Sequence, residues 1–121
     1  MLGYVTLGTN DLARAAKFYD ALTAEMGVGR MMENDQFIAW GGHGGAGIGL
    51  TKPFDGNAAS VGNGVMVALE AKDQEQVHRL YDIAIANGGT CEGPPGPRGE
   101  GFYAGYFRDL DGNKLNAFVM G

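Results

Sequence analysis

The chain has 121 residues and a mass of 12.7 kDa, a length that suits one domain, or two small modules sharing a core, and excludes two independent enzyme domains. Fourteen acidic and nine basic residues give a net charge of −5, which disfavours nucleic acid and membrane surfaces as partners. A single cysteine, no signal-peptide pattern and no apolar run of membrane-spanning length predict a cytoplasmic protein.

The first half of the chain reads as strand, helix and three strands. A strand-like segment begins at Tyr4, and helical spacing of apolar residues predicts a helix over about 11–25, capped by Asn10 or Asp11. Three short strand-like runs follow, at 30–32, 36–40 and 46–51. The glycine-rich segment between the last two lacks the lysine and helix that follow a phosphate-binding loop, so we expect a hairpin there.

The second half repeats the pattern of the first after a linker rich in glycine, asparagine, alanine and serine. A shift of 62 residues sets 4–27 on 66–89 without a gap and with seven identities in 24 positions. The repeat predicts a second helix over about 73–87, then strands near 90, at 101–108 and at 113–120. We therefore expect one α+β domain, with module 1 at about 1–55, the linker at about 53–63 and module 2 at about 64–121.

The tandem β-α-β-β-β unit, the opening VTLGTNDLARAAKFYDAL and the closing GYFRDLDGNKLNAF together resemble the vicinal oxygen chelate superfamily, which includes glyoxalase I, extradiol dioxygenases and bleomycin-resistance proteins. This resemblance implies tandem βαβββ modules that form a curved mixed sheet, with a concave cleft and with helices on the convex face. It also implies a homodimer and, in members that use a metal, one divalent ion held in the cleft by His or Gln early and Glu late in each half.

The four positions that match those metal ligands are Tyr4, Gly49, Met66 and Asn116, and none of them carries an imidazole or a carboxylate. We therefore predict no metal ligand and no cofactor. A divalent ion (Zn, Ni, Mn or Fe) is expected only under the alternative function given below. The imidazoles of His43 and His78 are not expected to meet. His43 is expected to be an exposed loop residue or, alternatively, a proton carrier at a pocket mouth.

Strand alternation predicts which side chains face the cleft. The expected ligand-binding residues are Tyr4, Thr6, Trp40, Gly49, Met66, Arg98, Tyr103 and Asn116. Tyr103 is included if the hairpin turn closes Arg108 against Asn113, whereas a bulge would exchange the faces. Trp40 is expected either at the cleft edge or in the core.

Arg98 belongs to the segment EGPPGPRGE, whose prolines predict a stiff extended loop over the sheet. Its guanidinium is a candidate clamp for an anionic ligand, and the alternative is an ion pair with Glu92 or Glu100.

The resemblance and the soft, neutral cleft predict a small-molecule-binding, glyoxalase/bleomycin-resistance-like protein without the usual metal ligands, whose organic ligand is anionic if Arg98 binds it. The alternative is a divalent-metal-dependent lyase, isomerase or dioxygenase of the same superfamily. A second alternative is a structural or regulatory homodimer. The sequence assigns no catalytic residue and no substrate.

Overall fold

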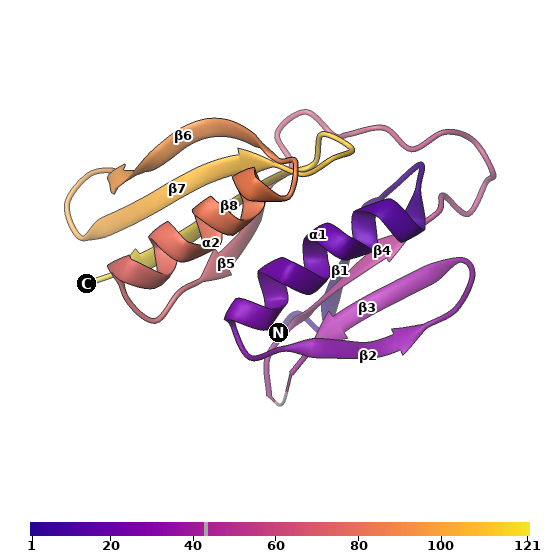
Figure 1. The fold of residues 1–121 in the computed structure, drawn as a ribbon, viewed down its shortest axis with the longest axis horizontal. Helices are drawn as coiled ribbons and strands as arrows, with labels where there is room; N and C mark the ends of the chain where they lie inside the picture. Colours follow the sequence, from indigo (N-terminus) through magenta and orange to yellow (C-terminus); the bar gives the residue numbers. More distant parts are fainter. Residues whose placement is uncertain (43) are drawn as a thin grey trace.

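The computed structural model describes residues 1–42 and 44–121 and contains two β-α-β-β-β units (Figure 1). The first consists of β1 (Tyr4–Gly8), α1 (Leu12–Glu25), β2 (Gly29–Glu33), β3 (Phe37–Gly41) and β4 (Gly47–Thr51). The second consists of β5 (Val67–Glu70), α2 (Gln74–Ala86), β6 (Thr90–Pro97), β7 (Phe102–Arg108) and β8 (Lys114–Met120). The expected α+β fold with tandem βαβββ modules is confirmed.

Each unit forms its own four-stranded mixed sheet. The strand orders are β1-β4-β3-β2 and β5-β8-β7-β6, with β1 parallel to β4 and β5 parallel to β8. Within the described residues, no strand of one sheet is hydrogen-bonded to a strand of the other. The curved sheet that we expected is therefore built from two sheets, and β1 and β5 each leave one edge unpaired.

The two helices begin at equivalent points of the repeat. The Asp11 side chain accepts a hydrogen bond from the backbone N–H of Arg14 at 3.1 Å, and Asp73 accepts one from Gln76 at 2.8 Å. These caps satisfy backbone donors that have no partner inside a helix. Neither α1 nor α2, the helices of the described residues, is long and apolar enough to cross a bilayer.

A single apolar core joins the two units on the helical side of the sheets. The helices lie on the same side and pack against each other (Figure 1). Phe18 of α1 approaches Phe107 of β7, with 6.4 Å between their ring centroids. Because both side chains are fully buried, α1 contributes to the core of both units.

Polar contacts at the turn between β7 and β8 hold the units together on the same side. The hydroxyl of Tyr19 on α1 donates to Asp109 at 2.7 Å, and the amide of Asn113 donates to the carbonyl of Gly8 at 3.0 Å. Burial and the charge of Asp109 raise the pKa of Tyr19 well above its usual value, so the hydroxyl remains a donor. The turn therefore serves as a structural joint between the units.

Strand β6 extends through a segment that we expected to be a loop. It runs along β7 from Thr90 to Pro97, with shifts of register between Cys91 and Gly93 and between Gly93 and Gly96. Proline has no N–H to donate and is tolerated on edge strands and at bulges. The prolines of EGPPGPRGE thus form an irregular edge strand, and only the residues after Pro97 form the turn.

Candidate functional site

The register between β7 and β8 determines which side chains form the concave face of the second unit, the face away from the helices. Arg108 pairs with Lys114, so Tyr106 lies opposite Asn116. Tyr103 is consequently on the helical side, where its hydroxyl is 2.6 Å from Nε2 of His78. The expected position of Tyr103 in the cleft is wrong, because a shift of one residue in register exchanges the two faces of a strand.

Trp40 belongs to the core and does not face the concave side. Its side chain is 1% exposed, and its indole N–H donates to Asp20 at 2.8 Å. It lines, together with Met66, a mostly apolar cavity of about 630 Å³ between the end of α1, β4 and β5. Of the two positions that we considered for Trp40, the structure therefore shows the core position.

In the first unit, an aromatic side chain fills the concave face. Tyr4 is 63% exposed and meets Phe37 edge to face, with 6.4 Å between the ring centroids. Thr6 pairs with Gly49, and a Cβ atom added to Gly49 would lie 2.6 Å from Cζ of Phe37. The space above Gly49 is thus occupied by Phe37, which we did not predict from the sequence.

The concave face of the second unit combines an aromatic ring with two cations. The ring of Tyr106 has the guanidinium carbon of Arg98 at 5.5 Å and the Nζ atom of Lys114 at 5.6 Å from its centroid. Both distances are in the range of cation–π attraction. Tyr106 was not among the expected site residues, because that expectation depended on the other register of the hairpin. Lys114, which shares a face of β8 with Asn116, was not among them either.

Asn116 lies beside this aromatic ring in an unusual state. The residue is 1% exposed, and among the described residues its Oδ1 is the one buried side-chain polar atom without a hydrogen-bond partner. Such an atom costs about 1–3 kcal/mol if it is left unsatisfied. A buried acceptor of this kind on a concave face is suited to a donor from outside the chain.

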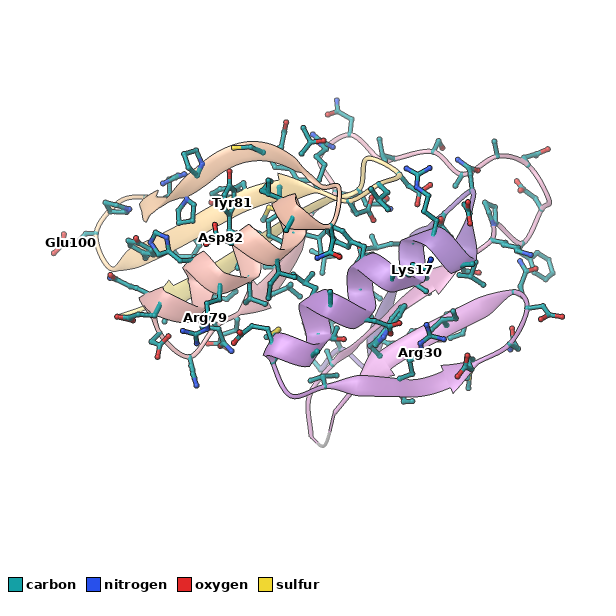
Figure 2. All side chains as sticks on the ribbon, viewed as in Figure 1. Lys17, Arg30, Arg79, Tyr81, Asp82 and Glu100 are labelled. Carbon is teal, nitrogen blue, oxygen red and sulfur yellow. The ribbon has the colours of Figure 1, made fainter. Side chains whose placement is uncertain are left out.

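Arg98 folds back along β6 toward Tyr106. Its Nη2 donates to the carbonyl of Pro94 at 2.6 Å, and its Nη1 donates to that of Pro97 at 3.4 Å. Glu92 pairs with Arg108 at 3.2 Å, and Figure 2 shows Glu100 at the tip of the β6–β7 turn, directed away from the molecule. Neither of the two ion pairs that we considered for Arg98 is present among the described residues.

The family model of the Glyoxalase/Bleomycin resistance protein/Dioxygenase superfamily matches residues 1–117. The chain belongs to this superfamily. A solved glyoxalase/bleomycin resistance protein from Albidiferax ferrireducens T118 is 38% identical over 100% of this chain and 99% of that chain, with a TM-score of 0.93. The superfamily resemblance is thereby confirmed.

More distant solved structures share the fold. The hypothetical protein SA1046 from S. aureus is 25% identical over 98% of this chain and 92% of that chain, with a TM-score of 0.76. Lactoylglutathione lyase from Agrobacterium tumefaciens is 19% identical over the same shares of the two chains, with a TM-score of 0.71, and shows the fold alone. No curated protein matches this chain.

The four positions that we expected, from the resemblance, to match the metal ligands of the superfamily carry none of the usual ligands of a divalent ion. They offer the phenol of Tyr4, the thioether of Met66, the amide of Asn116 and no side chain at Gly49, whereas Zn²⁺ prefers thiolate, imidazole or carboxylate. Residues 1–42 and 44–121 contain no group of three or more His, Cys, Asp or Glu arranged to hold a metal. His78 lies on the helical side, and His43 lies outside the described residues.

Proposed function

We propose that this member of the superfamily binds a small organic molecule on the concave face of its second sheet, without the divalent ion that other members use. The observation that carries the proposal is the buried, unpartnered Oδ1 of Asn116 beside Tyr106. Phe102 and Phe118 extend the same face as a stacked pair, with 5.5 Å between ring centroids. One polar acceptor next to apolar aromatic area is typical of sites for small organic ligands.

Native mass spectrometry of the purified protein tests this proposal together with thermal unfolding. We expect no stoichiometric divalent metal and a melting temperature that is unchanged by EDTA, because the four corresponding positions provide no metal ligand set. An organic ligand retained from the host should raise the melting temperature when it is added back. Tightly held metal whose removal abolishes an activity would instead support a metal-dependent lyase, isomerase or dioxygenase.

We also propose that the protein is a homodimer in which the open edges of β1 and β5 are covered by a second copy. Apolar side chains lie exposed on or beside these edges: Leu2, Tyr4, Val65 and Met66. Unpaired strand edges with exposed apolar neighbours are unfavourable in water unless another surface covers them. A second copy offers equivalent edges, so a two-fold arrangement would pair them reciprocally.

A further inference from the structure

Two cations on the concave face of the second sheet have no acidic partner among residues 1–42 and 44–121. The ion pairs of the described residues involve Arg30, Arg79 and Arg108, but neither Arg98 nor Lys114. Both of these charges lie within 6 Å of the centroid of one ring, in a chain whose net charge is −5. Because the ring is neutral, its attraction to the two cations does not neutralise either positive charge.

The position of Arg98 is built by the surrounding backbone. A Cβ atom added to Gly93 would lie 3.2 Å from Nη2, and one added to Gly96 would lie 3.1 Å from Nη1. The two glycines therefore leave the space that the guanidinium occupies. Its two bonds to carbonyl groups orient it without neutralising it, and a guanidinium has five N–H groups, so further donors remain for a ligand.

Lys114 reaches the same region from the opposite strand and also borders a hollow of about 510 Å³ between the β7–β8 hairpin and residues 61–66. Asn116 is two residues further along β8, so its side chain is on the same face as that of Lys114. A carboxylate has no N–H or O–H to give to the Oδ1 of Asn116. An anion alone would thus satisfy the two cations and leave this acceptor unpaired.

We propose that the ligand is an organic acid with a hydrogen-bond donor near its carboxylate and an apolar group beyond it. Arg98 and Lys114 bind the carboxylate, Asn116 accepts from the donor, and the stacked pair of Phe102 and Phe118 contacts the apolar group. This inference rests on the proposed function and adds the chemical class of the ligand.

Three related probes test the inference by ¹H–¹⁵N NMR titration of the full chain. 3-Phenyllactate has a carboxylate, a neighbouring hydroxyl and an aromatic ring, 3-phenylpropionate lacks the hydroxyl, and 3-phenyllactamide lacks the charge. We expect 3-phenyllactate to shift the amide signals of Tyr106 and Asn116 but not those of β1 to β4. The other two probes should bind about tenfold more weakly or worse, because each loses one of the proposed contacts.

Charge variants locate the anion site. Arg98→Gln and Lys114→Gln should each weaken binding of 3-phenyllactate about ten- to a hundredfold, and Lys114→Arg should retain most of the affinity. The matched controls are Arg14→Gln and Lys17→Gln, which remove the same charge from α1, where Figure 2 shows Lys17. These controls should bind 3-phenyllactate as the wild type does. A salt-dependent loss of affinity in all four glutamine variants would contradict the specific roles of Arg98 and Lys114.

The outcomes separate this inference from the function on which it rests. If 3-phenyllactamide bound at Tyr106 and Asn116 as tightly as 3-phenyllactate, a small-molecule site would remain. The inference that its ligand is an organic acid would be overturned. Inorganic phosphate that binds as tightly as 3-phenyllactate would reduce the site to a simple anion site and also overturn the inference. Absence of any binding by 3-phenyllactate at millimolar concentration would overturn it as well, while native mass spectrometry still decides the proposed function.

Discussion

At the scale of single residues, the hydrogen bonds around Asp20 join a charge to the only tryptophan of the chain. The hydrogen bonds from Arg30, followed by that from the indole of Trp40, lower the pKa of Asp20 below its usual value of 3.8. A carboxyl group whose pKa is lower in the folded state stabilises the protein when the pH is above the pKa of the unfolded chain. This stabilisation is lost as the pH falls through the pKa of the folded state.

The indole N–H resonance should report this titration directly. In the wild type, we expect its chemical shift to change with a midpoint below 3.8, the usual pKa of Asp20. Arg30→Gln should move the midpoint upward, because it removes the largest cause of the lowered pKa. Arg14→Gln, on the exposed side of α1, should leave it in place. An unchanged midpoint in the Arg30 variant would show that Arg30 does not control the charge of Asp20.

At the scale of elements, the junction between α2 and β6 depends on the absence of a side chain at Gly89. A Cβ atom there would lie 2.7 Å from the carbonyl oxygen of Ala84 and 2.8 Å from that of Arg108. Both obstacles are backbone atoms, so relief requires movement of α2 or β7. We expect Gly89→Ala to lower the free energy of unfolding by about 2 kcal/mol or more.

Urea denaturation measures this effect, and Gly29→Ala in β2 is the matched control. A Cβ atom at Gly29 would meet nothing within 4 Å, and its φ is not positive. The control should therefore change the free energy of unfolding by about 0.5 kcal/mol or less. Similar losses in both variants would mean that the cost comes from glycine replacement in general and not from the contacts of Gly89.

The elements also show which parts of the molecule could be predicted from the sequence. The helix bounds and the succession of elements along the chain were predictable, because capping residues and apolar spacing act locally. The order of the strands within each sheet was not predicted. The concave position of Tyr106 was not, since Arg108 pairs with Lys114 and not with Asn113. The position of Arg98 near Tyr106 depends on the two register shifts with which β6 pairs with β7. Regular strand alternation does not predict such shifts.

At the scale of the whole molecule, sedimentation tests the proposed homodimer. We expect a species of twice the chain mass of 12.7 kDa at micromolar concentration. The double change Leu2→Asp with Val65→Asp should weaken the dimer, because it places charges on the apolar surroundings of the open edges. Phe54→Asp, at an exposed linker residue, is the control. A single-chain mass for the wild type, or equal weakening by the control, would contradict this interface.

The absence of a shared strand ladder between the two described sheets has a consequence for cooperativity. In the described part of the chain, the units contact each other through α1, α2 and the joint at the β7–β8 turn, where Tyr19 donates to Asp109 and Asn113 donates to Gly8. Fluorescence of Trp40 follows the first unit, and an environment-sensitive fluorophore attached to the exposed thiol of Cys91 in β6 follows the second. The wild type should unfold with coincident midpoints by both probes, because one core spans the units. Tyr19→Phe removes a buried hydrogen bond from the joint. This variant should separate the two midpoints, so that each unit unfolds in a transition of its own.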